Sequence, residues 1–222
     1  ADDIATEEVW LGENGAMHAM KTGAFVIECS TLSLNHVNEL AATAKQKRLT
    51  YIDCPVTAIP DAAEQGQLTL LVGASQKDYE RCSELLQSFS KSIRHFGDIG
   101  TGTGYKLMIN LMGAVQIAAL AEGIAMAEKL GLDMETVVAS IETGAAASPQ
   151  VIRYARRMAE RNFLKDPAFT IQLRHKDAMY AIKLAEENGA PVKLGAVARD
   201  WFAVAKKDYN DADEANVINM MI

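Results

Sequence analysis

The chain has 222 residues, with 22 basic and 29 acidic side chains and a formal net charge of −7. Apolar residues make up 49% and charged residues 23%, a globular composition that excludes the disordered, collagen-like and coiled-coil classes. The acidic balance argues against nucleic acid and anionic membranes as partners, because phosphate polymers are bound mainly through Lys and Arg. The length allows one large domain or two small ones.

The cysteines and histidines predict neither a disulfide framework nor a metal site. The three cysteines form no CxxC pair, and the four histidines lack metal-ligand spacing. No basic and apolar leader opens the chain, so we expect no secretory signal and favour a reducing cytoplasm as the location. The residues concerned are Cys29, Cys54, Cys82, His18, His36, His95 and His175.

The first hundred residues have an α/β pattern. Residues 24–29 (AFVIEC) and 50–54 (TYIDC) are apolar and β-prone, and apolar residues recur at helical spacing between them, after Ser33 as the expected N-cap. A strand, a helix and a strand with short links predict a βαβ crossover in a parallel sheet. Two further strands, separated by another helix, are predicted at residues 68–72 and 92–96.

The rest of the chain is predicted to be all α. Residues 97–104 (GDIGTGTG) are expected to form a flexible turn before a long helix from Tyr105 to about residue 131, with Gly131 as its C-cap. The apolar part of that helix, residues 107–121, is shorter than the roughly 20 residues needed to cross a bilayer, so we predict a buried helix. Further helix starts are predicted at Asp133, Ser148-Pro149 and near Thr170.

The predicted domains are therefore residues 1–99 and 100–222, and their junction carries the most informative motif. In Gly100-x-Gly102-x-x-x-Lys106-x-x-x-Asn110, the lysine and the amide lie four residues apart, on one helix face. Burial at a cleft would lower the pKa of a lysine into the range useful for proton transfer. From this spacing alone, a surface lysine whose stem lies along the helix is the other interpretation.

Four segments in this order resemble the β-hydroxyacid dehydrogenase family, which includes 3-hydroxyisobutyrate dehydrogenase, tartronate semialdehyde reductase and the glyoxylate/succinic semialdehyde reductases. They are residues 28–31 (ECST), 53–57 (DCPVT) continuing to 66–73 (GQLTLLVG), 100–110, and 173–177 (LRHKD). The resemblance implies an α/β Rossmann-type domain, of which only the C-terminal half is present, followed by an all-α domain like that of 6-phosphogluconate dehydrogenase.

The resemblance also implies the chemistry. Lys106 would be the proton donor or acceptor and Asn110 would contact the substrate oxygen, while NADP or NAD exchanges a hydride with the substrate carbon. The substrate would be a small hydroxy acid, or a related alcohol, and its semialdehyde or keto form. The family further implies a homodimer or homotetramer through the helical domain, and Met108, Met112 and Met126 are candidates for that contact.

Two pairs of residues would contact the cofactor if the resemblance holds. Ser30 and Thr31 follow a predicted strand at its carboxyl end, where open α/β sheets bind ligands. Helix capping by Thr31 or Ser33 is the alternative role there. Lys176 and Asp177 match the Lys-Asp pair of the family, with a solvated ion pair on a helix as the alternative.

The chain departs from the family where a loop usually holds the substrate carboxylate. The family has Ser-Gly-Gly after Pro-Val, whereas this chain has Thr57, Ala58 and Ile59, followed by Pro60. Thr57 keeps a hydroxyl, but Ile59 disfavours positive φ and Pro60 lacks a backbone donor. These changes suggest a bulkier or less acidic substrate than is usual.

Two other functions stay open. One is an imine reductase, which has the same architecture but usually an acidic or phenolic proton donor, so Lys106 argues against it. The other is a non-catalytic piece that dimerises through its helical half, because no GxGxxG turn for the cofactor pyrophosphate is found. The first residues resemble a point inside the nucleotide-binding domain, so we expect a truncated chain or part of a longer one.

Overall fold

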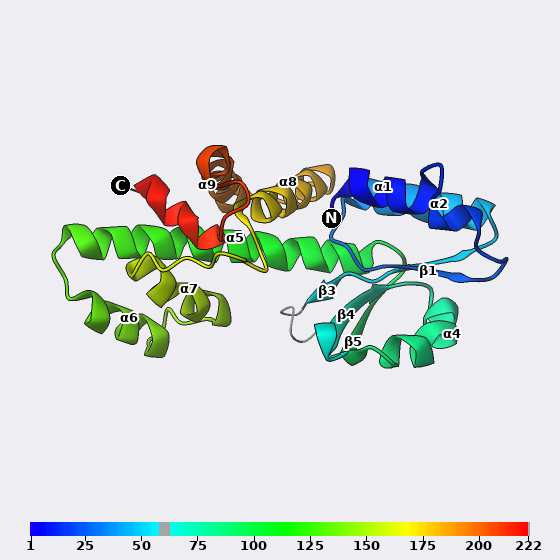
Figure 1. Cartoon of the computed structure of the whole chain (residues 1–222), viewed down its shortest axis with the longest axis horizontal. Helices are drawn as coiled ribbons and strands as arrows, with labels where there is room; N and C mark the ends of the chain where they lie inside the picture. The colour runs from blue at the N-terminus through cyan, green and yellow to red at the C-terminus, as the bar shows by residue number, and fades with distance from the viewer. Residues whose placement is uncertain (58–62, 222) are drawn as a thin grey trace. The chain divides into compact units, whose positions relative to one another are not determined.

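The computed structural model describes residues 1–57 and 63–221. By its internal contacts the chain divides into two units, Ala1–Met108 and Ile109–Ile222. Helix α5 (Thr101–Lys129) contributes its first turns to one unit and the rest to the other. Figure 1 shows a sheet flanked by helices in the first unit and helices alone in the second.

The first unit is an α/β domain, as predicted. Its described strands are β1 (Phe25–Glu28), β2 (Thr50–Asp53), β3 (Val56–Thr57), β4 (Leu68–Gly73) and β5 (Ser90–Gly97). β1 runs parallel to β2 through helix α2 (Leu34–Gln46), and β4 runs parallel to β5 through α4 (Gln76–Gln87). The predicted βαβ crossover is therefore confirmed, and the second predicted pair of strands with its helix forms a crossover as well.

The sheet differs from the prediction in the direction of β4 relative to two of its neighbours. β4 is antiparallel to both β2 and β3, so the sheet is mixed rather than parallel. Pro55 lies between β2 and β3, and because it has no backbone N–H it interrupts their hydrogen bonding to β4. Its carbonyl still accepts from Leu71 N at 2.9 Å. The two residues of β3 are too few to show a periodicity, which is why no strand was predicted there.

Alternating side chains give the sheet two apolar faces. Val26 and Tyr51 pack with α2 and with the end of α1 (Asp3–Leu11), a helix that was not predicted. Ile52 and Leu70 pack on the other side with α4. Ser33 is the N-cap of α2, as predicted, because its Oγ accepts a hydrogen bond from His36 N at 3.2 Å. A short 3₁₀ turn, η1 (Ala16–His18), precedes β1.

The second unit consists of helices around one core. They are the main part of α5, α6 (Met134–Thr143), α7 (Pro149–Ala159), α8 (Ile171–Glu187), α9 (Lys193–Tyr209) and the 3₁₀ segment η2 (Glu214–Met221). The predicted caps Asp133 and Ser148 accept the expected backbone N–H, and Thr170, near which a helix start was predicted, is the N-cap of α8. Gly131 adopts φ +69° and ends α5 by donating to Glu128 O, while Leu132 donates to Ala127 O.

Helix α5 is long and apolar enough to cross a membrane if length and composition alone are considered. Of its most apolar 18-residue window, 39% is buried within the chain. The buried side includes Ala114, Ile117, Ala121 and Ile124, which belong to the core of the helical unit. We therefore interpret α5 as the central helix of that unit, although more of its surface is uncovered than we predicted.

Candidate active site

Asp53 fixes the start of the helix that carries Lys106. Asp53 is the last residue of β2 and is 1% exposed. Oδ2 accepts from Gly100 N at 3.0 Å and Thr103 N at 2.9 Å, and Oδ1 accepts from Thr103 Oγ1 at 2.6 Å. Burial raises the pKa of Asp53, whereas these hydrogen bonds favour its ionised form. Because the carboxylate satisfies the first N–H groups, the helix begins at Thr101, and the predicted turn over residues 97–104 is wrong for its second half.

The glycines of the motif let the helix start lie directly on the sheet. A Cβ on Gly102 would stand 2.2 Å from the carbonyl oxygen of Leu71, in β4. Gly100 has φ +91°, and a Cβ there would stand 2.6 Å from Leu34 Cδ1. Backbone contact therefore accounts for both glycines, and phosphate binding is not needed to explain them.

We expect Gly102→Ala to destabilise the first unit by about 3 kcal/mol, because the backbone carbonyl of Leu71 cannot rotate away from the added methyl group. Chemical denaturation followed by circular dichroism measures the change. Gly104→Ala is the matched control, because a Cβ at Gly104 would meet nothing within 4 Å. We expect the control to stabilise the helix by up to about 1 kcal/mol. Equal stability of the two variants would contradict the role of Gly102.

Asn110 lies one turn after Lys106 on α5 and is held by a carboxylate. Lys106 is partly buried, and Asn110 is 9% exposed. Asn110 Nδ2 donates to Asp177 Oδ2 at 2.6 Å, across 67 residues of sequence. The amide plane of Asn110 is thereby oriented.

Lys176 and Asp177 are not a solvated pair. Lys176 Nζ lies 3.0 Å from Asp177 Oδ1, and their side chains are 14% and 2% exposed. The ammonium group also lies 5.2 Å from the centre of the Tyr180 ring. The second unit therefore joins three predicted site residues, Asn110, Lys176 and Asp177, in one buried cluster.

Arg174 is a buried neighbour of this cluster that we did not predict. Its Nη1 donates to the backbone oxygen of Asn110 at 2.8 Å. Its Nε and Nη2 donate to Glu214 Oε2 and Oε1 at 2.5 and 3.1 Å, and the Tyr154 hydroxyl also donates to Glu214. A Cβ at Gly113 would stand 3.0 Å from Arg174 Nη1, so that glycine makes room for the guanidinium group.

The pattern of α8 offered a signal for Arg174, because this residue precedes Asp177 by three positions and so lies on the same helix face. Glu214 gave no such signal. It lies in η2, 40 residues from Arg174 along the chain. The ion pair is therefore visible only in the folded unit.

Ser30 and Thr31 lie at the carboxyl end of β1, before α2 begins, and both are partly buried. The carboxylate of Glu28 accepts from Ser30 N at 2.6 Å and from Trp10 Nε1 at 2.5 Å. This fixes the backbone of the turn. Since Ser33 is the N-cap of α2, the hydroxyl groups of Ser30 and Thr31 precede the helix at the edge where such sheets bind ligands.

The predicted substrate loop is only partly visible. Thr57 ends β3 and is exposed. Ala58 and Ile59 lie outside the described residues. Within residues 1–57 and 63–221, no group of three or more His, Cys, Asp or Glu side chains is arranged to hold a metal ion.

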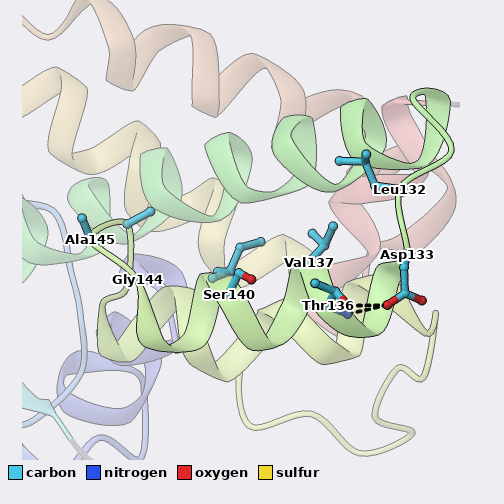
Figure 2. A pocket seen from close by; sticks show the side chains of 9 residues that line it. Leu132, Asp133, Thr136, Val137, Ser140, Gly144 and Ala145 are labelled. Atoms are coloured by element: carbon cyan, nitrogen blue, oxygen red, sulfur yellow. Dashed lines mark hydrogen bonds between the residues drawn. The ribbon is translucent and has the colours of Figure 1, made fainter.

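Two surface hollows lie apart from these residues. One, of about 470 Å³, lies along α6, where Val137 and Ser140 point from the helix into the hollow (Figure 2). The only carboxylate in its lining, Asp133, is occupied by Thr136, whose N and Oγ1 donate to it at 3.0 and 2.5 Å. The other, of about 110 Å³, lies between α5 and α9 and is lined mainly by apolar residues.

A Rossmann-like sheet, followed by a long helix and a helical domain, is an architecture found among dinucleotide-binding oxidoreductases. The profile described as the NAD binding domain of 6-phosphogluconate dehydrogenase matches residues 1–97. The profile described as NAD-binding of NADP-dependent 3-hydroxyisobutyrate dehydrogenase matches residues 100–221. The chain belongs to the β-hydroxyacid dehydrogenase family.

Several relatives by sequence are named as dehydrogenases or oxidoreductases. The chain is 31% identical to 2-(hydroxymethyl)glutarate dehydrogenase of Eubacterium barkeri over 88% of its own length and 65% of the relative. It is 30% identical to the probable mitochondrial 3-hydroxyisobutyrate dehydrogenase of Dictyostelium discoideum, over 91% of its own length and 65% of the relative. The chain thus spans about two thirds of the length of these relatives.

Solved structures confirm the fold. A 3-hydroxyisobutyrate dehydrogenase from Salmonella typhimurium superposes with a TM-score of 0.89 at 24% identity, covering 99% of this chain and 76% of the other. The Mycobacterium tuberculosis 3-hydroxyisobutyrate dehydrogenase, solved with L-serine, gives 0.86 at 26% identity with the same coverage. The predicted fold class is therefore confirmed, and the two NAD-binding profiles support the predicted NAD(P) cofactor.

Proposed function

We propose that the protein containing this chain is an NAD(P)-dependent dehydrogenase or reductase that interconverts a small hydroxy acid, or a related alcohol, and its semialdehyde or keto form. The observation that carries the proposal is the buried Asn110–Asp177–Lys176 cluster, which begins one turn after Lys106 on α5. A structural role alone does not require an amide, a carboxylate and an ammonium group together in a buried position.

We assign roles to Lys106 and to two residues of the cluster. Lys106 donates a proton to the substrate oxygen as negative charge grows there during reduction, and takes it back during oxidation. Asn110 orients that oxygen through its amide. Asp177 holds the Asn110 amide at 2.6 Å and balances the charge of Lys176. The nicotinamide, when bound, supplies or accepts the hydride.

The first unit fits the nicotinamide end of the cofactor by the chemistry of its donors. Ser30 and Thr31 provide two hydroxyl groups on a turn whose backbone is held by Glu28, and hydroxyl groups of this kind pair with ribose or amide groups. Thr57 offers another hydroxyl, at the exposed end of β3, for the substrate. We propose Ser30, Thr31, Lys176 and Asp177 for cofactor binding and residues 57–59 for substrate binding.

The proposal is tested with the full-length protein, first by calorimetric titration with NADPH and with NADH. The oxidation of the dinucleotide that binds is then measured with a panel of small semialdehydes as substrates. A parallel panel of cyclic imines tests the imine reductase alternative. We expect dinucleotide binding and turnover with at least one semialdehyde. Turnover of imines alone would overturn the substrate class, and a protein that binds neither dinucleotide would be the non-catalytic dimerisation piece.

We also propose that the helical domain pairs with a second copy of the chain, in the cytoplasm. Leu194, Val197 and Val204 lie on one side of α9 and are 74%, 56% and 51% exposed. Met108, Met112 and Met126 of α5 are also about half exposed or more. Long apolar side chains at helical spacing on two helices favour a helical partner. Sedimentation velocity tests the pairing, and a monomer would contradict it.

A further inference from the structure

Cys29 and Cys54 follow two strands that are paired residue by residue. β1 and β2 are parallel, with Glu28 opposite Asp53, and Cys54 N donates to Glu28 O at 2.9 Å just past the end of the ladder. Neighbouring strands lie about 4.8 Å apart. The Cα atoms of a disulfide lie about 4.4–6.8 Å apart, so this position permits a bond between the two sulfurs without moving the strands.

Both thiols point to the same face of the sheet. Because side chains alternate along a strand, Cys29 and Cys54 point away from the side taken by Glu28 and Asp53. Both pack in the apolar cluster beneath α4. Each thiol is the largest influence on the pKa of the other, as expected for neighbours on one face of the sheet.

The two thiols differ in exposure and in the direction of their pKa shifts. Cys29 is partly exposed, whereas Cys54 is buried. The hydrogen bond from Cys54 lowers the pKa of Cys29, and the same bond together with burial raises the pKa of Cys54. A partly exposed thiol with a lowered pKa beside a second thiol is the arrangement that reacts with peroxides and is then resolved as a disulfide.

The third cysteine lacks these features. Cys82 is buried in α4, and its thiol donates to Tyr79 O at 3.4 Å. Burial raises its pKa. Cys82 therefore serves as an internal reference for a thiol in the same apolar cluster that has no strand-paired cysteine.

We propose that Cys29 and Cys54 form a reversible oxidation site for hydroperoxides. The Cys29 thiolate attacks the peroxide, an S–O bond forms, the O–O bond breaks, and the leaving oxygen takes up a proton as water or alcohol. The Cys54 sulfur then attacks the Cys29 sulfenic acid, which forms the S–S bond and releases water. The two thiols lose two electrons and two protons in total, which the peroxide accepts, and a dithiol reductant reverses the change.

The bond would join the ends of β1 and β2 directly before Ser30, at the turn held by Glu28. Its formation does not depend on dinucleotide binding or on turnover. The oxidation can therefore be tested even if the proposed dehydrogenase function fails.

The test exposes the full chain to hydrogen peroxide and follows free thiols and mass. We expect the thiol count under denaturing conditions to fall from three to one, and the mass to fall by about 2 Da. Peptide mapping without reduction should show Cys29 joined to Cys54, and dithiothreitol should restore three thiols. Alkylation of Cys29 in the reduced chain should be roughly tenfold faster than that of Cys82.

Two variants complete the test. Cys54→Ala should stop at a Cys29 sulfenic acid, about 16 Da heavier, which dimedone traps. Cys82→Ala is the matched control and should form the same disulfide as the parent chain. A disulfide that includes Cys82, a bond only between two copies, or equal oxidation of all three thiols in the parent chain would overturn the proposal, even if Cys54→Ala fails to fold.

Discussion

Replacing Lys106 with alanine is expected to lower kcat/KM of the full-length enzyme about a thousandfold while leaving its unfolding free energy nearly unchanged. A positioned proton donor contributes a factor of about 10² to 10⁴, and here it also stabilises the negative charge that develops on the substrate oxygen. Lys106 is partly buried in the second turn of α5, whose start is fixed by Asp53 and not by the lysine. Steady-state kinetics and chemical denaturation of the same preparation measure both quantities.

One further variant separates the charge of Lys106 from its proton, and another serves as a control. Lys106→Arg keeps a positive charge, but its guanidinium group does not release a proton near neutral pH, so we expect activity to stay low. Lys129→Ala makes the same change at the far end of α5, where the lysine is exposed, and should behave as the parent. Near-normal turnover by Lys106→Ala would refute the catalytic role, and so would a loss of activity in Lys129→Ala of equal size.

The parts of the fold that depend on neighbours in sequence were predictable. Ser33, Asp133, Ser148 and Thr170 cap the helices that follow them, because an N-cap acts on an N–H group only two or three residues away. The first βαβ crossover was predicted for the same reason, and so were the strands and the helix of the second, since the strand and helix periodicities are local.

The parts that depend on distant residues were not predictable. The start of α5 is set by Asp53, which lies 47 residues before Gly100, so the glycine-containing segment was taken for a turn. The antiparallel direction of β4 depends on the path of the chain around Pro55. No pattern within β4 itself indicates that direction.

The candidate site shows the same division. The resemblance pointed to Asn110 and to Lys176 with Asp177, and the second unit brings these three residues into contact. Neither periodicity nor spacing indicated that Asp177 would be buried and bonded to Asn110, because that contact joins α5 and α8. Cys29 and Cys54 gave no sequence signal at all, since only the register of β1 and β2 makes them neighbours.

Breaking the Arg174–Glu214 pair is expected to have the largest effect on stability. Arg174 is 5% exposed and Glu214 is 1% exposed, so Arg174→Met leaves a buried carboxylate without its partner. Loss of one partner of a buried ion pair costs about 3–5 kcal/mol. The variant also removes the donor to the backbone oxygen of Asn110, so the cluster on α5 loses one of its supports.

Hydrogen exchange measured by mass spectrometry on α8 and η2, together with denaturation of the whole chain, tests this expectation. Arg156→Met is the matched control, because Arg156 pairs with Glu135 at 2.8 Å but the two side chains are 43% and 70% exposed. An exposed pair of this kind contributes less than about 1 kcal/mol. The double variant Arg174→Met with Glu214→Met should recover much of the loss, since no unpaired charge then remains in the core. If Arg174→Met costs no more than the control, then Glu214 reaches water or another cation when Arg174 is absent, and the pair does not hold η2 against α8.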